Sequence, residues 1–259
     1  MAQRGLKELA GTGTLKLGHF IVEFATPGIG QILKAAGCDF ALFDLERSGF
    51  SFETVKSAIR YFEAAGVAVI VRVPAQESDM LARACDMGAE GLIAPMISTV
   101  AQAQAMVDAV KYFPLGKRGV GLQMAHDNYR SAPVAEALNN ANNRTTVICL
   151  IETADGAANA DGIAALQGVD GLWVGHFDLS VSLGIPGEFS HPTFQAAIEK
   201  IIGAAKKHGK SLGRLVPNTD QGIAHYKQGF DFICYSGDIW VLRDGLAAAA
   251  KTIREGIKA

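Results

Sequence analysis

The sequence predicts a single (β/α)8 barrel of the TIM type, and three observations lead to this prediction. Eight short apolar segments alternate with longer segments of helical periodicity along the chain. The apolar segments are hydrophobic on both faces, which is typical of buried parallel strands. A length of 259 residues suits one barrel of this kind, with no internal domain boundary. An open doubly wound sheet is the alternative, because strand order cannot be read from one sequence.

The expected elements follow one another at regular intervals. The strands are expected at residues 17–24, 40–45, 68–73, 91–96, 146–152, 171–176, 211–216 and 232–237. The clearest helical patterns cover residues 51–66, 77–88, 99–113, 191–209 and 238–253. The first of these helices is expected to begin at Ser51, whose hydroxyl can cap the free amides of the first turn. Residues 113–144 form an unusually long excursion before the fifth strand, and such excursions are commonly functional or oligomer-forming.

The composition excludes several classes of function. Hydrophobic residues make up 49% of the chain, and 24 basic against 26 acidic residues leave a net charge of -2. No basic tract stands out, so neither nucleic acid nor an anionic membrane is expected as a partner. The longest apolar run, GVAVIV, is far shorter than the ~20 residues that a membrane span needs. A polar N-terminus and four scattered cysteines, with Cys149 and Cys234 expected as buried free thiols, fit a cytoplasmic protein.

Charged side chains gather at one end of the predicted strands. They are Glu23, Asp44, Glu46, Arg72, Glu152 and Asp178. The carboxyl ends of the strands carry the active site in barrels of this type, so we expect these side chains to share a polar pocket. The alternative is that strand ends simply become polar where they reach solvent. Several carboxylates and one arginine on successive strands favour a site.

Glu152 and Asp178 follow neighbouring predicted strands, in LIETADG and GHFDLS. Two carboxylates without cysteine or clustered histidine form a hard, oxygen-rich site that suits Mg²⁺ or Mn²⁺, with Co²⁺ and Zn²⁺ as further candidates. Arg72 can clamp a carboxylate or enolate oxygen with its planar guanidinium, or else form a structural ion pair. No GxGxxG, Walker lysine or GxSxG motif is present. Lys16 and Lys210 lie at strand starts, the wrong end for Schiff-base chemistry.

Two histidines lie nearest to the expected pocket. His126 stands in the long excursion, in MAHDNYR, where it is either part of a lid or of a contact with a neighbouring subunit, or an ordinary surface histidine. His176 follows Gly175 at a predicted strand end and can orient a ligand or bond to the backbone.

Six motifs occur in a fixed order: FDLE at 43–46, VRVP at 71–74, DMGAEGLIAPM at 86–96, YFPLGKRGVG at 112–121, IET at 151–153 and GHFDLS at 175–180. In these motifs the sequence resembles the metal-dependent (class II) pyruvate aldolases of the HpcH/HpaI family, which includes 4-hydroxy-2-oxoheptanedioate and 2-keto-3-deoxy-sugar-acid aldolases. The likeness covers roughly residues 15–250. It implies an aldehyde-lyase that cleaves or forms 4-hydroxy-2-oxo acids, with a 2-oxo acid and an aldehyde as its small-molecule partners.

The resemblance also implies an assembly and a set of residue roles. The last helix of the barrel would be swapped between subunits, in a homo-oligomer such as a hexamer built as a trimer of dimers. Glu152 and Asp178 would bind the metal directly, and Asp44 would act through metal-bound water. Arg72 would bind the keto oxygen and stabilise the enolate. The remaining contacts would come from the backbone amides of Phe177 and Asp178, which receive the substrate carboxylate, and from Pro95 and Met96, which line the pocket.

One position departs from the family pattern in a way that affects the chemistry. Relatives usually carry Asp-x-Glu-His where this chain has Asp44-Leu45-Glu46-Arg47, and the aspartate that pairs with that histidine corresponds to Asp86. Arginine is not a base at neutral pH, but Arg47 can form an ion pair with Asp86. A second departure is Leu150, where many relatives carry glutamine.

Three hypotheses accommodate Arg47. In the first, the chain is an aldolase in which metal hydroxide or His126 takes the proton. In the second, it performs related enolate chemistry, such as oxaloacetate decarboxylation or a citrate-forming condensation as in siderophore-pathway relatives. In the third, it has lost catalysis and remains as an oligomeric binding protein.

Overall fold

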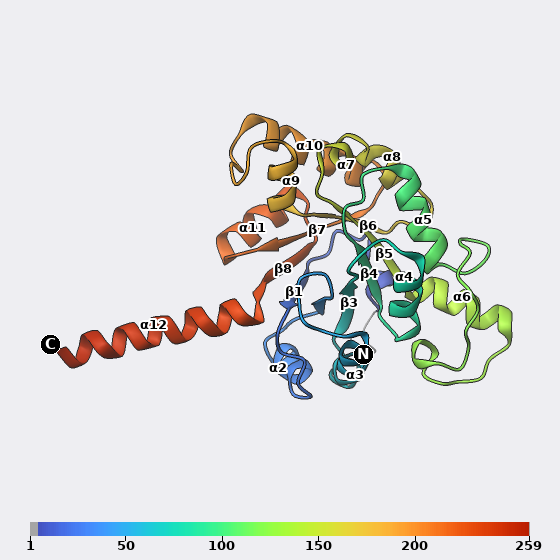
Figure 1. Ribbon diagram of the computed structural model, residues 1–259, viewed down its shortest axis with the longest axis horizontal. Coiled ribbons are helices and arrows are strands. Elements are labelled where there is room, and N and C mark those ends of the chain that lie inside the picture. The colour runs from blue at the N-terminus through green and yellow to red at the C-terminus, as the bar shows by residue number, and fades with distance from the viewer. Residues whose placement is uncertain (1–4, 259) are drawn as a thin grey trace.

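The computed structural model describes residues 5–258 and contains a closed barrel of eight parallel strands, which confirms the predicted fold class and removes the open sheet (Figure 1). The strands run in chain order around the barrel: β1 (Lys16–Ile21), β2 (Phe40–Asp44), β3 (Ala68–Arg72), β4 (Gly91–Ala94), β5 (Thr146–Ile151), β6 (Gly171–Val174), β7 (Ser211–Val216) and β8 (Phe232–Gly237). Each expected strand is present, and several end one to three residues earlier than the apolar pattern predicts.

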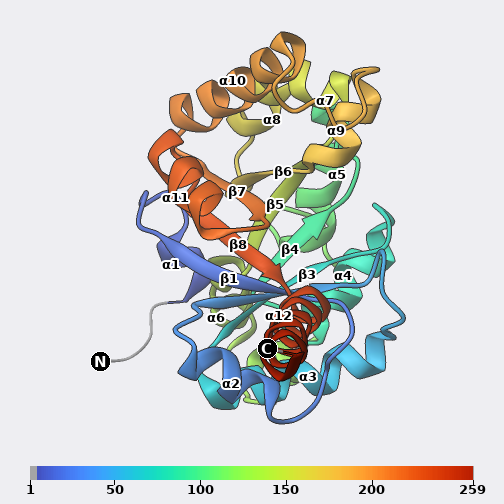
Figure 2. The ribbon, with the colours of Figure 1, turned by 90° about the vertical axis from the view of Figure 1, so that its left-hand side faces the viewer.

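Helices accompany the strands, and all but the last of them lie around the outer side of the barrel (Figure 2). They are α1 (Leu6–Leu9), α2 (Ile29–Ala35), α3 (Phe52–Ala65), α4 (Ser78–Asp86), α5 (Val100–Val110), α6 (Val134–Arg144), α7 (Ala154–Ala158), α8 (Ala160–Ala165), α9 (His176–Ser182), α10 (Pro192–Lys207), α11 (Thr219–Gln228) and α12 (Asp238–Lys258). The predicted cap of α3 is confirmed, because the Ser51 hydroxyl accepts a hydrogen bond from the Thr54 amide at 3.1 Å. Helix α6 escaped the sequence analysis because its sequence, VAEALNNANNR, buries only Asn142.

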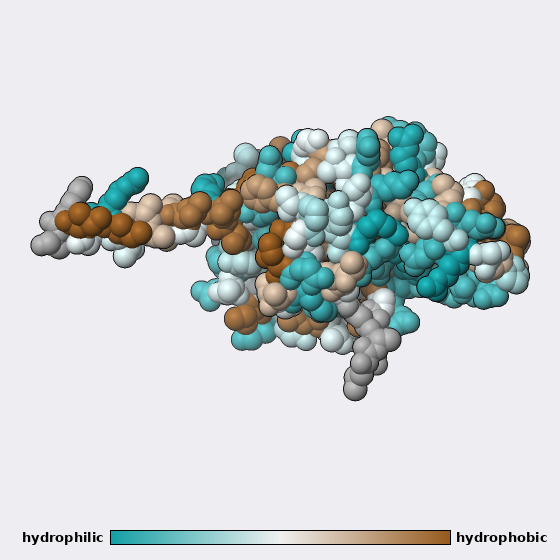
Figure 3. All heavy atoms as spheres, turned by 90° about the horizontal axis from the view of Figure 1, so that it is seen from below, coloured by the Kyte–Doolittle hydropathy of each residue, from teal (hydrophilic) through white to brown (hydrophobic). Residues whose placement is uncertain are grey.

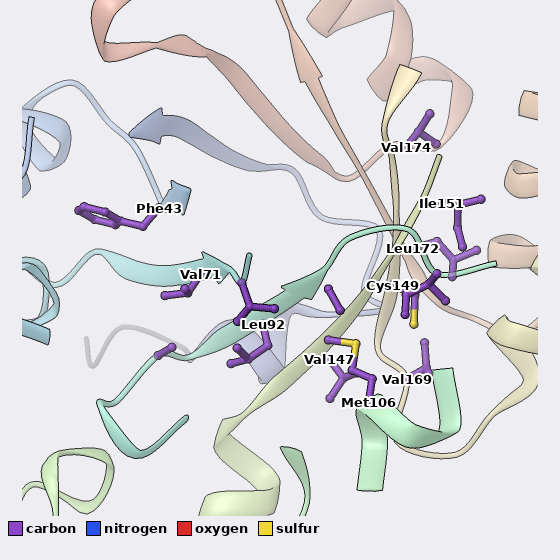
Figure 4. Close-up of a cluster of buried hydrophobic side chains, with 14 of the residues drawn as sticks. Phe43, Val71, Leu92, Met106, Val147, Cys149, Ile151, Val169, Leu172 and Val174 are labelled. Carbon is purple, nitrogen blue, oxygen red and sulfur yellow. The ribbon is translucent and has the colours of Figure 1, made fainter. Parts of the chain in front are cut away.

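The hydrophobic core has two layers. The outer layer lies between the strands and the helices and contains side chains such as Phe43, Leu92 and Cys149 (Figure 4). The inner layer fills the barrel and contains Phe40 and Trp173. Cys149 and Cys234 are buried free thiols, as predicted. Within the described residues, no helix is both long and apolar enough to cross a membrane.

The excursion at residues 113–144 is more ordered than its sequence suggests. A short 3-10 turn, η1 (Ala125–Asp127), and helix α6 occupy much of it. It also exposes large apolar side chains, namely Phe113, Val120, Met124, Tyr129 and Val134.

The last helix, α12, leaves the barrel and projects away from it (Figures 1 and 2). Its exposed apolar side chains recur at helical spacing, at Leu242, Leu246, Ile253 and Ile257. Figure 3 shows hydrophobic surface along the projecting helix. On the side of the barrel, between α2 and α11, lies an apolar groove of about 810 Å³ lined by residues such as Ile32, Leu33 and Ile223. This is the position that a helix following β8 would fill in a complete ring of helices.

Candidate active site

A cavity of about 370 Å³ opens at the carboxyl ends of the strands, where the sequence predicts the site. Charged and apolar side chains line it together. Seven of the candidate site residues are among them: Asp44, Arg47, Arg72, Glu152, His176, Phe177 and Asp178. The lining residues are Phe20, Val22, Leu42, Asp44, Arg47, Arg72, Ile93, Leu150, Glu152, Trp173, Val174, Gly175, His176, Phe177, Asp178, Leu215, Ile239 and Trp240. Because β2, β3, β5 and β6 run parallel in one closed barrel, the residues that end or follow them meet at this one mouth.

Arg72 is held rigidly by two carboxylates. Its Nε and Nη2 atoms donate to the two oxygens of Asp44 at 2.8 and 2.7 Å, and its Nη1 lies 3.1 Å from Oε2 of Glu46. Asp44 is fully buried, and its oxygens also accept the amides of Glu46 and Arg47 at 2.9 and 3.2 Å. Asp44 therefore fixes both the guanidinium plane and the turn that follows β2. The interactions with both acids raise the pKa of Arg72 despite its burial, which keeps it charged.

Glu152 forms no ion pair with any of the residues that the structure describes. It is 3% exposed, and its Oε1 accepts the Met96 amide at 2.8 Å. Met96 adopts a left-handed φ of 58°, a strained conformation for this residue type. A side chain at Gly175 would collide with Glu152, so only glycine leaves room for it there. The pKa of Glu152 is raised to about 7, mainly by burial and also by the charges of Asp178 and Glu46. The Met96 amide and Arg72 oppose this shift.

Asp178 and Phe177 lie in the first turn of α9, which begins at the mouth of the cavity. Both are exposed. The amides of a first helical turn have no partner within the helix, and they point along its axis toward the N-terminal side. His176, at the start of the same turn, packs against Phe177 with ring centroids 4.4 Å apart. Burial lowers the pKa of His176 to about 4, so it is neutral at pH 7.

Several predicted residues stand outside the cavity. Glu23 is exposed beyond the end of β1, and it does not line the cavity. Pro95 and Met96 are not among the lining residues. The Met96 amide instead donates a hydrogen bond to the Glu152 carboxylate.

Asp86 and His126 form a second cluster with residues of the excursion. Asp86 ends α4, on the side of the barrel where strands begin, and forms an ion pair with Arg118. His126 is buried beside Tyr112, with ring centroids 6.5 Å apart. In this chain neither residue lines the cavity.

The predicted ion pair between Arg47 and Asp86 is wrong. Asp86 pairs with Arg118, and Arg47 lies 3.1 Å from Glu46 while 66% of its side chain stays exposed. The excursion supplies Arg118 to Asp86, and a single sequence does not reveal this contact. Arg47 instead presents its positive charge at the mouth of the cavity.

Sequence reasoning missed the aromatic wall of the site. Phe20 stacks on Trp240 with ring centroids 6.1 Å apart, and the guanidinium of Arg72 lies 5.5 Å from the Phe20 ring centre. Asp238, the first residue of α12, accepts the amides of Glu23 and Phe24 at 2.9 and 2.8 Å and so shapes the loop after β1. Phe20 stands inside an apolar strand and Trp240 inside a helical pattern, so neither differs from a core residue in the sequence.

The donor set fits one divalent cation. Glu152 and Asp178 repel each other across the cavity, and the charge of Asp178 contributes to the raised pKa of Glu152. A cation between them would relieve this repulsion and keep Glu152 ionised. Two carboxylates are hard oxygen ligands of the kind that Mg²⁺ and Mn²⁺ prefer. No group of three or more acidic, histidine or cysteine side chains with metal-binding geometry occurs in residues 5–258, so water or substrate would complete the coordination shell.

Comparison with known proteins identifies similar sequences and structures. The family model for HpcH/HpaI aldolase/citrate lyase matches residues 18–243. A 5-keto-4-deoxy-D-glucarate aldolase from Klebsiella pneumoniae is 32% identical over 231 residues, which are 89% of this chain and 90% of that protein. The crystal structure of an HpcH/HpaI aldolase from Desulfitobacterium hafniense superposes with a TM-score of 0.91 at 30% identity, covering 97% of each chain. Citrate synthase SbnG superposes with a TM-score of 0.88 at 29% identity, covering 98% of this chain and 99% of that one.

The raised pKa of Glu152 predicts how the free energy of unfolding depends on pH when no metal is bound. Because its folded-state pKa of about 7 exceeds the ordinary value of 4.5, its contribution to stability is complete below pH 4.5 and is lost as the pH rises through 7. Glu152→Gln keeps the acceptor for the Met96 amide but carries no charge. Between pH 5 and 8 in EDTA, the variant should gain up to about 3 kcal/mol relative to the parent protein in urea unfolding. Parallel pH profiles for the two proteins would contradict the shifted pKa.

Proposed function

This chain belongs to the HpcH/HpaI aldolase/citrate lyase family, and we propose that it is a divalent-metal-dependent aldolase that makes or breaks the carbon–carbon bond of a 4-hydroxy-2-oxo acid. The observation that carries this proposal is the cavity itself. A charged, fixed Arg72 shares the cavity with two carboxylates, Glu152 and Asp178, and neither of these forms an ion pair with any residue from 5 to 258. This combination suits a substrate that develops negative charge on an oxygen next to a metal.

The 2-oxo acid half of the substrate would bind between Arg72 and the start of α9. Arg72 would donate to the keto oxygen, and its charge would stabilise the negative oxygen of the enolate. The amides of Phe177 and Asp178 would receive the substrate carboxylate, which the partial positive charge of a helix N-terminus favours. Asp44 holds the guanidinium plane, so Arg72 needs little reorganisation when the charge develops.

Glu152 and Asp178 would hold the cation, with Mg²⁺ or Mn²⁺ as the preferred ions. A bound divalent cation supplies Lewis-acid polarisation of the keto oxygen. The walls formed by Phe20, Trp173 and Trp240 limit the access of water and so strengthen the electrostatic interactions inside.

The positive charge of Arg47 would favour certain second substrates over others. At neutral pH it is a fixed cation and cannot take a proton. Its exposed guanidinium at the cavity mouth would attract a second substrate that carries a carboxylate. A citrate-forming condensation, in which a 2-oxo diacid is the acceptor, an acetyl thioester supplies the attacking enolate and the thioester is then hydrolysed, is therefore the second candidate function, and the likeness to citrate synthase SbnG supports it.

We further propose that two copies exchange their α12 helices. In one chain the apolar stripe of α12 and the apolar groove between α2 and α11 are both exposed. Inserting the helix of one copy into the groove of another would bury both surfaces, in a reciprocal arrangement with two-fold symmetry. Trimerisation of such dimers would give the hexamer that the family resemblance implies.

The enolising activity can be tested directly. In D₂O with Mg²⁺, the protein should exchange the methyl protons of pyruvate, which proton NMR detects as loss of the methyl signal. EDTA should abolish the exchange. Arg72→Lys should lower the rate by about 10² to 10³, because a point charge replaces a fixed, two-pronged donor. Exchange that persists in EDTA would contradict the metal-dependent mechanism, and no exchange with several divalent metals would contradict pyruvate enolisation.

Replacing Arg47 distinguishes the hypotheses about proton transfer. Arg47→His should increase the exchange rate at least about tenfold at pH 7.5, since imidazole titrates near neutrality and can take a proton. Arg47→Gln is the control that removes the charge without adding a base. Equal rates in the two variants would show that the proton leaves by another group. Exchange in the histidine variant alone would support a binding protein that has lost catalysis.

The exchange of α12 predicts the size of the particle. Light scattering after size exclusion should show a dimer or a larger oligomer for the parent protein. Leu246→Glu together with Ile253→Glu should yield monomers, because two charges would enter an apolar groove. Lys251→Glu is the control, as Lys251 lies on the opposite side of the helix from the stripe. A monomeric parent protein, or an unchanged size of the double variant, would contradict the exchange.

A further inference from the structure

The turn that follows β4 holds its backbone in a strained conformation. Met96 has a φ of 58°, in the left-handed region that residues other than glycine rarely adopt. Its amide donates to Oε1 of Glu152 at 2.8 Å, and Glu152 is 3% exposed. A strained residue keeps such a conformation only where its neighbours hold it, so the contacts of this turn indicate what fixes the Met96 amide.

Gln76, in the loop after β3, holds this turn through its side-chain amide. Its Nε2 atom donates to the carbonyl oxygens of Pro95 and Met96 at 2.8 and 3.0 Å. These carbonyls belong to the two peptide units on either side of the Met96 Cα, so one side chain restrains both backbone dihedral angles of Met96. Gln76 itself does not line the cavity.

The peptide unit between Pro95 and Met96 is held at both of its ends. In a trans peptide the carbonyl and the amide hydrogen point in opposite directions. The Pro95 carbonyl accepts from Gln76, and the Met96 amide donates to Glu152, so these groups form one chain of hydrogen bonds. Hydrogen bonds in such a chain polarise and strengthen one another. Gln76 therefore acts on the Glu152 carboxylate without contacting it.

Other contacts anchor the later part of the turn. The Ser98 hydroxyl also donates to the Met96 carbonyl, at 3.2 Å, and the Ile97 amide donates to a carbonyl of β5 at 3.1 Å. Neither of these groups bonds to the Pro95 carbonyl, whose donor among residues 5–258 is Gln76. Gln76 thus holds the peptide unit that faces Glu152, while the other contacts hold the unit after it.

We propose that Gln76 is a positioning residue for Glu152, because it fixes the peptide unit whose amide orients that carboxylate. The inference rests on the proposed role of Glu152 as a metal ligand. With Oε1 held by the Met96 amide, Glu152 keeps one orientation in the cavity. Losing a hydrogen bond that orients a metal ligand typically weakens metal affinity by about 10- to 100-fold.

A purely structural role for Gln76 would have different consequences. The side chain is half-buried and its bond to the Met96 carbonyl is exposed to solvent, so it contributes little to the free energy of unfolding. A mere link between two loops would change stability alone. A positioning residue changes the protection of the Met96 amide and the affinity for metal, at a nearly unchanged melting temperature.

Hydrogen exchange tests the position of the Met96 amide without any metal. Gln76→Met keeps the length of the side chain and removes the donor. In EDTA, the Met96 amide should exchange at least about tenfold faster in this variant than in the parent protein, as measured by mass spectrometry at single-residue resolution. Gln104→Met is the matched control, because it removes a half-buried side-chain amide that bonds to Asp108 on α5.

Binding of Mn²⁺ tests the consequence for Glu152. Electron paramagnetic resonance of free Mn²⁺ should give a dissociation constant about 10- to 100-fold higher for Gln76→Met than for the parent protein, and an unchanged one for Gln104→Met. Unchanged exchange of the Met96 amide in Gln76→Met, or an unchanged Mn²⁺ affinity, would overturn the proposal. If the parent protein does not bind Mn²⁺, the metal-dependent function is contradicted, and the exchange of the Met96 amide alone decides whether Gln76 positions Glu152.

Discussion

The site depends on the two-pronged contact between Arg72 and Asp44. Their positions at the ends of adjacent parallel strands are paired in register, so the backbone places the two side chains opposite each other. Asp44 is fully buried and would be costly to ionise there without a partner. Arg72 compensates this charge, and Asp44 in turn prevents the guanidinium from rotating. The same carboxylate accepts two amides of the turn after β2, which orients Glu46 toward Arg72 and Arg47 toward the cavity mouth.

Asp44 and Glu46 balance the positive charge of Arg72. The negative charges of Glu152 and Asp178 are therefore left without a positive partner among the described residues. Glu152 is buried with one amide as its hydrogen-bond donor, and Asp178 repels it from α9. The backbone accommodates this arrangement with a left-handed residue at Met96 and a glycine at position 175. Strain and unbalanced charge at one point of a well-packed barrel are typical of a functional site, because a fold optimised only for stability would avoid both.

The sequence was informative where local patterns decide the structure. Eight apolar segments predict the strands because a parallel barrel buries both faces of each, and the barrel rule then brings Asp44, Arg72, Glu152 and Asp178 to one end. It was uninformative where a contact depends on the path of a long connection. The pairing of Asp86 with Arg118 requires the excursion to return to α4, and no periodicity encodes that return. Polar, exposed helices such as α6 and α11 were missed for a related reason, since they bury too little to leave an apolar pattern.

The first turn of α12 joins the cavity to the outer surface of the molecule. Asp238 caps the loop after β1, and Trp240 stacks on Phe20, whose ring contacts Arg72. The same helix then runs outward with its apolar stripe exposed. The direction in which α12 leaves the barrel is thus fixed by residues that form the wall of the site. A force that moves the helix would tilt Trp240 and, through Phe20, disturb the guanidinium that the site depends on. Covering the stripe of α12 would therefore stabilise the position of Arg72 as well as the helix itself.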